Sequence, residues 1–405
     1  MTDIGSMYVA SVRPSERIKG RVPGTVLALG TVSLLTDVSA EMMTAFMPVY
    51  LLVTLNLNYA QFGVLDGLYT GATAVLRLVG GHLSDRTNRH KAVAAVGYGL
   101  SAVTKFLFPL AGTSAFGIGA TMAADRAGKG LRSAPRDALI SLATPPDRLG
   151  AAFGVHRTMD TIGALLGPLI TFLLLQQIGI VAGPVFAVSG AFAIVGLIVL
   201  IAFVREHPKK PDRGPAPAIR AGLALLKDRK FRRVAIGTAV LGLATLSDAF
   251  VFILVQKATA VPLGLLPLMP LGTALIFLAA ATPLGRLADR IGRWPVFLGG
   301  HVLLLAVYVM LLAPGSGYLG VGAALLLHGL FYAATDGVLS ARVSPLVPET
   351  LRASGLAAVQ TGQALARLVS SVAFGYLLEK ATFHAAVLAA IAALVVSVLV
   401  AWRLK

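Results

Sequence analysis

The feature that most constrains this fold is a series of long apolar segments, each about the length of a membrane-spanning helix. A helix that crosses the hydrocarbon core of a bilayer needs roughly 20 mostly apolar residues. The 405-residue chain contains twelve such candidates, which begin near residues 26, 61, 92, 116, 152, 182, 234, 265, 296, 318, 354 and 383. We therefore expect an all-α integral membrane protein with twelve transmembrane helices.

The composition agrees with a membrane protein. Hydrophobic residues make up 56% of the chain and charged residues only 13%, whereas about one quarter of the residues of a soluble domain are charged. The formal net charge of +17 falls in short segments between the apolar runs. It therefore does not indicate nucleic-acid binding, which would need a basic face on a soluble domain. The chain has no cysteine, so we expect no disulfide and no thiolate metal site, and neither a metal nor a cofactor.

The basic residues predict which ends of the spans face the cytoplasm. The connections after the odd-numbered spans contain only Lys257 and Lys380 as basic residues, whereas the central stretch 205–233 has ten Lys or Arg and three acidic residues. Basic connections stay inside, so we expect this stretch and both termini in the cytoplasm. The N-terminus lacks the apolar core and cleavage site of a signal peptide. We therefore expect a multi-pass protein of the cell membrane, namely the bacterial inner membrane.

The chain contains an internal repeat. "GHLSDRTNRH" at 81–90 pairs with "GRLADRIGRW" at 285–294, a shift of 204 residues, and the same shift places Arg148 on Arg352. Duplicated six-span halves occur in secondary transporters. We expect an N-terminal tail (1–22), a six-helix bundle (23–204), a cytoplasmic linker (205–233) and a second six-helix bundle (234–405).

At this point the sequence resembles the major facilitator superfamily over essentially its whole length. The 81–90 segment follows the family's motif A, G-x-L-a-D-r-x-G-r-k, with Asn88 in place of a glycine. The resemblance implies two pseudo-symmetric six-helix bundles and a salt-bridged latch that closes the cytoplasmic side in one state. Cytoplasmic anchoring charge alone is the alternative. The expected gating residues are Gly81, Asp85, Arg86 and Arg89, with Gly285, Asp289 and Arg290 in the second half.

Span five is similar to the family's motif C, which is typical of exporters that exchange substrate for protons. The closing Gly-Gly of that motif is replaced here by Thr171 and Phe172. Glycines four residues apart also let helices approach closely, so helix packing is an alternative explanation. The residues that match the motif are Gly154, Gly163, Gly167 and Pro168.

Span four carries "DRAGKGLRSAPRD" (125–137), with six charged side chains in thirteen residues. A charge at the bilayer centre costs at least about 2.5–3.5 kcal/mol, so these groups must face a water-filled cavity or acidic partners. The stretch resembles motif B, with Arg126 as its arginine and Lys129 at the family's glutamine position. The resemblance implies that spans one, four, seven and ten line the transport path. Arg136 and Asp137 lie near the cytoplasmic end, so we expect them to act in gating.

Span one offers acidic partners for these cations. Asp37 and Glu41 are four residues apart, which places both carboxylates on one face of a helix, where they could meet Arg126, Lys129 or Arg132. The proton affinity of a carboxylate depends on its burial and on nearby cations, so a cavity that opens and closes could make one bind and release a proton. We predict proton coupling by Asp37, Glu41 and Arg126, and substrate binding by Lys129 and Arg132. A static ion-pair network is the alternative.

The second half contributes fewer candidates. By the family arrangement, the side chains expected to face the cavity and bind substrate are Asp248, Asp336, Phe331 and Tyr332. Met43 and Met47 follow Glu41 at helical spacing, and thioethers suit copper(I). Methionine in a helix is more often a packing residue, so metal or metal-chelate transport is the weaker alternative.

Together these features predict a secondary active transporter, not an enzyme. The chain has neither G-x-x-x-x-G-K-[ST] nor H-E-x-x-H, the signatures of nucleotide-binding and zinc-protease sites. We expect alternating access, proton coupling and, narrowly, efflux of a small organic solute. The rival is uptake or exchange of an anionic metabolite, because arginine suits carboxylate and phosphate. A non-transporting membrane sensor is a further alternative. By resemblance the protein is expected to be a monomer in the lipid bilayer.

Overall fold

The computed structural model describes residues 23–69, 89–145, 148–205, 224–313, 316–348 and 351–404. Their contacts divide the chain into two compact units. The described residues of 23–56 and 89–205 form the N-terminal unit, and those of 57–69 and 224–404 form the C-terminal unit. The helical residues 59–69, at the position of the predicted second span, thus group with the C-terminal unit by their contacts.

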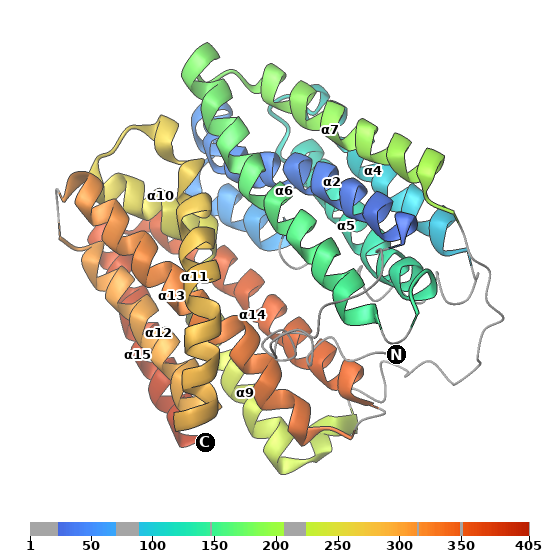
Figure 1. The fold of residues 1–405 in the computed structure, drawn as a ribbon. Coiled ribbons are helices and arrows are strands. Elements are labelled where there is room, and N and C mark those ends of the chain that lie inside the picture. Colours follow the sequence, from blue (N-terminus) through green and yellow to red (C-terminus); the bar gives the residue numbers. More distant parts are fainter. Residues whose placement is uncertain are drawn as a thin grey trace. The chain divides into compact units, whose positions relative to one another are not determined.

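The N-terminal unit is built from long helices (Figure 1). Helix α2 packs against α6 and α7, and α4 packs against α5 and α7. Its apolar core includes Val26, Leu29, Tyr98, Ile140 and Leu200. The helices are α2 (Gly24–Val49, continued by a π-helical turn at Tyr50–Thr54), α4 (His90–Leu110), α5 (Ala115–Leu142), α6 (Leu149–Ile178) and α7 (Ala182–Phe203).

The C-terminal unit is likewise helical (Figure 1). Helix α13 packs against α11 and α12, and α9 packs against α14 and α15. Phe231, Trp294, Phe297 and Val343 belong to its core. The helices are α9 (Arg229–Ala244), α10 (Asp248–Thr259), α11 (Leu268–Ile291), α12 (Arg293–Met310), α13 (Gly317–Val343), α14 (Arg352–Lys380) and α15 (Phe383–Arg403), with short 3₁₀ turns at Leu225–Lys227, Leu263–Leu265 and Ser344–Leu346.

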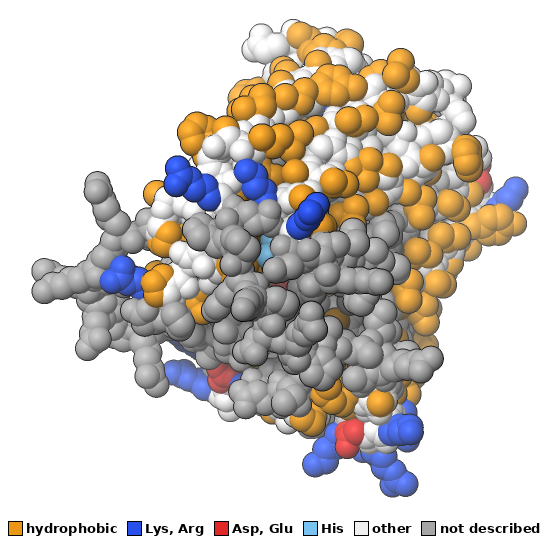
Figure 2. Space-filling model, turned by 90° about the vertical axis from the view of Figure 1, so that its right-hand side faces the viewer, with side chains coloured by type: hydrophobic (Ala, Val, Ile, Leu, Met, Phe, Trp, Pro, Cys, Tyr) orange, Lys and Arg blue, Asp and Glu red, His pale blue; other side chains and the backbone are white. Residues whose placement is uncertain are grey.

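The helices agree with the predicted spans. Within the described residues, nine helical stretches are long and apolar enough to cross a membrane. Helices α5 and α14 are equally long but more polar, and residues 59–69 are helical where the second span is expected. The surface also fits a lipid environment, because hydrophobic side chains cover much of the face in Figure 2 while Lys and Arg gather in small groups. The chain is an all-helical, multi-pass membrane protein.

Span seven differs from a single continuous helix, because α9 ends at Ala244 and α10 begins at Asp248. Irregular backbone is tolerated at membrane depth only where protein surrounds it or where it lines a cavity. Here the buried Tyr308 provides hydrogen-bond partners for backbone groups at the break. Its hydroxyl accepts a hydrogen bond from the backbone N–H of Leu246 at 2.8 Å and donates to the carbonyl of Ala244 at 3.4 Å.

Candidate functional site

Helix α5 presents its charged side chains to two neighbours. At 3.6 residues per turn, Lys129, Arg132 and Arg136 recur along the side that meets α2, while Asp125 meets α4. Close approach of α4 and α5 depends on glycine: a Cβ on Gly97 would lie 2.8 Å from the carbonyl oxygen of Gly128. Helix α5 therefore packs closely along α4 and meets α2 mainly through its long charged side chains.

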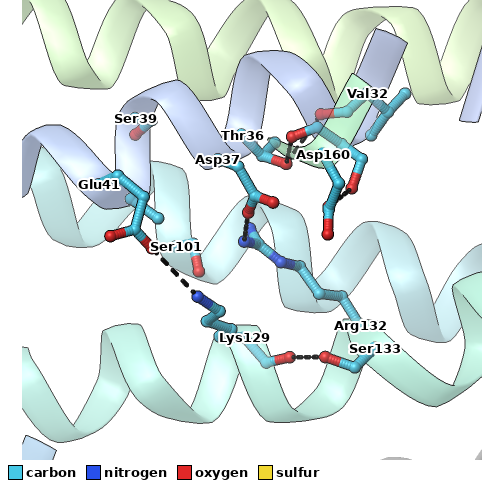
Figure 3. A network of polar contacts seen from close by, with 12 residues as sticks. Val32, Thr36, Asp37, Ser39, Glu41, Ser101, Lys129, Arg132, Ser133 and Asp160 are labelled. Atoms are coloured by element: carbon cyan, nitrogen blue, oxygen red, sulfur yellow. Dashed lines mark hydrogen bonds and ion pairs between the residues drawn. The ribbon is translucent and has the colours of Figure 1, made fainter. Parts of the chain in front are cut away.

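The predicted meeting of span one with span four is present (Figure 3). Arg132 Nη2 lies 3.7 Å from Asp37 Oδ1, and Lys129 Nζ lies 3.6 Å from Glu41 Oε1. These separations exceed the 2.7–3.2 Å of a normal hydrogen bond, so the contacts are electrostatic. The Lys129 and Glu41 side chains are 28% and 26% exposed. The Lys129–Glu41 pair is therefore weakly held and accessible.

Asp37 also faces a second carboxyl. Asp160 of α6 lies next to it (Figure 3), so the two carboxyls act on each other electrostatically. Ser33 donates to Asp160 at 2.7 Å and fixes its position.

Arg126 forms an ion pair with a residue of its own helix. Its described ion pair is with the neighbouring Asp125, whose other oxygen lies 2.6 Å from Lys105 Nζ of α4. Lys105 is 1% exposed and escaped the sequence reasoning. The available signal was a single lysine within the apolar third span, "GYGLSAVTKFLF". Burying a cation is costly unless it is paired, which predicts a carboxylate beside it.

A small cavity of about 10 Å³ lies among these groups in the N-terminal unit. That volume is about the size needed for one water molecule. Four cations and one carboxylate are among its lining residues, and two of the cations are also paired with Asp37 and Glu41 of α2. The lining includes Thr36, Ser39, Ser101, Lys105, Asp125, Arg126, Lys129 and Arg132.

The expected gating pair at the end of α5 joins a wider network. Arg136 contacts Asp137 at 3.1 Å and Asp160 at 3.7 Å, and it donates to the Ser33 hydroxyl at 3.0 Å. Asp160 also meets Arg157 at 3.4 Å. Arg136 thus links α5, α2 and α6 through one carboxylate, which is the kind of contact that can hold helices together in one state.

The motif C residues of α6 pack against α2. A Cβ on Gly167 would lie 2.8 Å from Glu41 Cβ and from the backbone nitrogen of Met42, and Gly163 packs on the backbone of Leu34. Gly154 has open space around it. The two inner glycines therefore set how near α6 comes to the helix that carries Asp37 and Glu41. Pro168 lies within α6.

The second-half candidates lie in the C-terminal unit. Asp248, at the start of α10, accepts a hydrogen bond from the Tyr332 hydroxyl, and His328 Nε2 lies 3.6 Å from it. His328 is buried, its Nδ1 3.3 Å from Thr273 Oγ1, and it too escaped the sequence reasoning. Phe331 is 1% exposed and packs on the His328 ring. Asp336 lies further along α13 and is exposed.

The motif A candidates are described only in part. Gly81, Asp85 and Arg86 lie outside the described residues, and Arg89 directly precedes α4. In the second half, Asp289 and Arg290 lie in the last turn of α11, and Gly285 lies one turn earlier. Asp289 pairs with Arg293 of α12 at 3.2 Å. The methionines behind the alternative of metal transport, Met43 and Met47, are buried in the core, and the described residues hold no cluster of three His, Cys, Asp or Glu suited to a metal.

Comparison with known proteins agrees with these observations. An uncharacterized MFS-type transporter of Methanocaldococcus jannaschii is 28% identical over 368 residues, covering 87% of this chain and 88% of the relative. Among solved structures, a mutant of the nucleoside transporter NupG superposes with a TM-score of 0.82 at 15% identity, covering 94% of this chain and 99% of that one. At that identity the likeness concerns the fold alone.

A shorter match concerns the multidrug resistance protein MdtG of Serratia proteamaculans, which is 31% identical over 186 residues. It covers 44% of this chain and 43% of the relative, so the likeness extends over less than half of each. The model of the Major Facilitator Superfamily matches residues 29–277 and 245–405. The repeat, the helical fold and these matches together establish that the chain belongs to the major facilitator superfamily of transporters.

Proposed function

We propose that this transporter moves a small organic solute by proton-coupled alternating access, with the carboxylates of α2 as the proton carriers. The observation that carries the proposal is the set of contacts around Asp37. Its carboxylate lies 3.7 Å from Arg132 and next to a second carboxyl, Asp160. A group that has a cation on one side and a carboxyl on the other has two alternative ways to be neutralised.

The two ways correspond to two states of the cycle. When Arg132 and Lys129 lie near α2, their charges offset those of Asp37 and Glu41. When helix movement draws the cations away, either a proton or a bound solute must take their place, because an unpaired buried charge is costly. The proton and the solute then compete for the same carboxylates, and this competition couples the movement of one to the movement of the other.

Efflux is the favoured direction. The glycine pattern of α6 resembles the exporter motif, and the MdtG relatives are named for multidrug resistance. The second candidate is transport of an anionic metabolite. It is favoured by the number of cations that line the small cavity: Lys105, Arg126, Lys129 and Arg132.

The test uses purified protein in liposomes that contain a pH-sensitive dye. A pH gradient is imposed, and lipophilic cations, neutral amphiphiles and mono- and dicarboxylates are added in turn. We expect one class to produce proton movement, and Asp37→Asn and Glu41→Gln each to reduce it by at least tenfold. Glu379→Gln is the matched control, because Glu379 is exposed and accepts its hydrogen bond from a backbone N–H.

The outcomes separate the alternatives. Solute flux that ignores pH and both α2 variants would show that the network is a static gate and not a proton carrier. Flux confined to carboxylates, with Lys129→Gln and Arg132→Gln raising the KM, would favour the anionic metabolite. A panel with solute binding but no flux would indicate a sensor.

A further inference from the structure

A second cavity, unconnected with the α2–α5 network, lies at one end of the C-terminal unit. Its volume is about 250 Å³, and it lies where α11 ends, α12 begins and α13 ends. The positive-inside pattern predicts that this end faces the cytoplasm. The residues that line it are Ala288, Asp289, Gly292, Arg293, Arg342 and Pro345.

The charged groups of this cavity leave an unused donor. Arg293 is engaged with Asp289 at 3.2 Å and donates to the carbonyl of Ala341 at 2.6 Å. Arg342 differs, because its Nε is buried and has no hydrogen-bond partner among the described residues. A buried donor without an acceptor is costly. Asp289 is already compensated by Arg293, so the guanidinium of Arg342 is the surplus positive charge in the lining.

The backbone at the same place also favours an anion. Helix α12 begins directly after Gly292, which has φ of 104° and no side chain to cap the helix. The first amides of a helix have no acceptor within it, and the positive end of the helix dipole attracts negative charge. Gly292 itself lines the cavity, so the first amides of α12, those of Arg293 and Trp294 before Pro295, begin at its wall.

The surroundings distinguish between anions. Planar arginine forks match phosphate oxygens, and the volume exceeds what a lone carboxylate needs. Exposed apolar side chains stand beside the charged groups: Leu287 and Ile291, at the end of α11, are 40% and 58% exposed. Arg286 and Arg290 on the same helix end add exposed positive charge. Cations next to an apolar surface at a helix end suit a headgroup with acyl chains.

We propose that this cavity binds a phosphate group, with Arg342 as its main ligand and the phospholipid of the adjacent leaflet as its source. The site goes beyond the transported solute and does not depend on which solute that is. A bound headgroup would tie together the ends of α11, α12 and α13.

The experiment titrates the detergent-purified full chain with phosphatidylglycerol and follows binding by native mass spectrometry. Diacylglycerol with the same acyl chains but no phosphate is the control lipid. We expect Arg342→Gln to weaken phosphatidylglycerol binding about tenfold, the usual effect of losing one charge-assisted contact. Arg342→Lys, which keeps the charge but lacks Nε, should lie between. Arg403→Gln, at the exposed end of α15, should match the wild type.

Two results would overturn the proposal: equal binding by Arg342→Gln and Arg403→Gln, or diacylglycerol binding as tightly as phosphatidylglycerol. Size-exclusion profiles show which variants are folded. If Arg342→Gln does not fold, the comparison is made with Arg342→Lys instead. A second arm identifies the source. Inorganic phosphate at millimolar concentration is added to the lipid complex, with chloride at equal ionic strength as the control. If phosphate displaces the lipid, the site binds phosphate and its source is soluble. If phosphate does not displace the lipid, the source is the phospholipid.

Discussion

At the scale of single residues, the most demanding group in the N-terminal unit is Lys105. It is almost completely buried, and Asp125 is shared between it and Arg126. The three form an ion triad within the apolar interior of a membrane protein. Such a group is paired by necessity, because the desolvation of each charge must be offset by its neighbour.

We predict that Lys105→Met lowers the free energy of unfolding by about 3 kcal/mol, because it removes one of the two cations on a buried carboxylate. Thermal or denaturant unfolding in detergent measures this. The matched control is Lys129→Met, whose side chain is 28% exposed and 3.6 Å from its partner; exposed pairs contribute about 0–1 kcal/mol. The double variant Lys105→Met, Asp125→Asn should be less stable still, because it also removes the carboxylate that pairs with the buried Arg126. Equal effects of the two lysine variants would contradict a structural role for the triad.

At the scale of helices, the contact of α6 with α2 positions the acidic face. Gly167 has no room for a methyl group, whereas a Cβ added to Gly154 would have no other atom within 4 Å. We predict that Gly167→Ala costs about 1–3 kcal/mol through overpacking and reduces transport, because it displaces Glu41. Gly154→Ala should be neutral in both assays. If the two variants unfold at the same temperature, the close approach of these helices is not required.

The break between α9 and α10 gives a second prediction at this scale. Tyr308→Phe removes the hydroxyl that satisfies Leu246 N–H and the Ala244 carbonyl. We expect a loss of about 1–3 kcal/mol, the usual cost of a buried unsatisfied group, seen as a lower thermal midpoint. Tyr318→Phe is the control, since Tyr318 is 70% exposed. An unchanged midpoint for Tyr308→Phe would mean that water or backbone adjustment replaces the hydroxyl.

At the scale of the whole molecule, the charge pattern predicts an orientation in the membrane. Because the chain has no cysteine, each introduced thiol is unique. We expect Thr113→Cys, between α4 and α5, to react with a membrane-impermeant maleimide in intact cells. Lys227→Cys, before α9, should react with the same maleimide only after the membrane is permeabilised. The reverse labelling would place the termini outside and invert the predicted topology.

Much of the fold was predictable from the sequence because the position of a membrane-spanning helix depends on the hydropathy of its own residues. The helices begin at residues 24, 90, 115 and 149, against predicted starts near 26, 92, 116 and 152. Ion pairs between residues close together in the chain, such as Asp289 with Arg293, could also be predicted from the sequence. Lys105 and His328 were not, because an isolated polar residue in an apolar span says nothing about which helix supplies its partner.

By itself the sequence determined that this chain spans a membrane many times, repeats its halves and places a dense charge cluster on span four. Those properties follow from composition and spacing along the chain. Only the tertiary structure decided which charges meet. Arg132 reaches Asp37 and Lys129 reaches Glu41, while Asp125 turns to Lys105. The reason is physical: each residue turns a helix by about 100°, so the partner of a charge depends on helix rotation and on the glycine contacts that set helix separation.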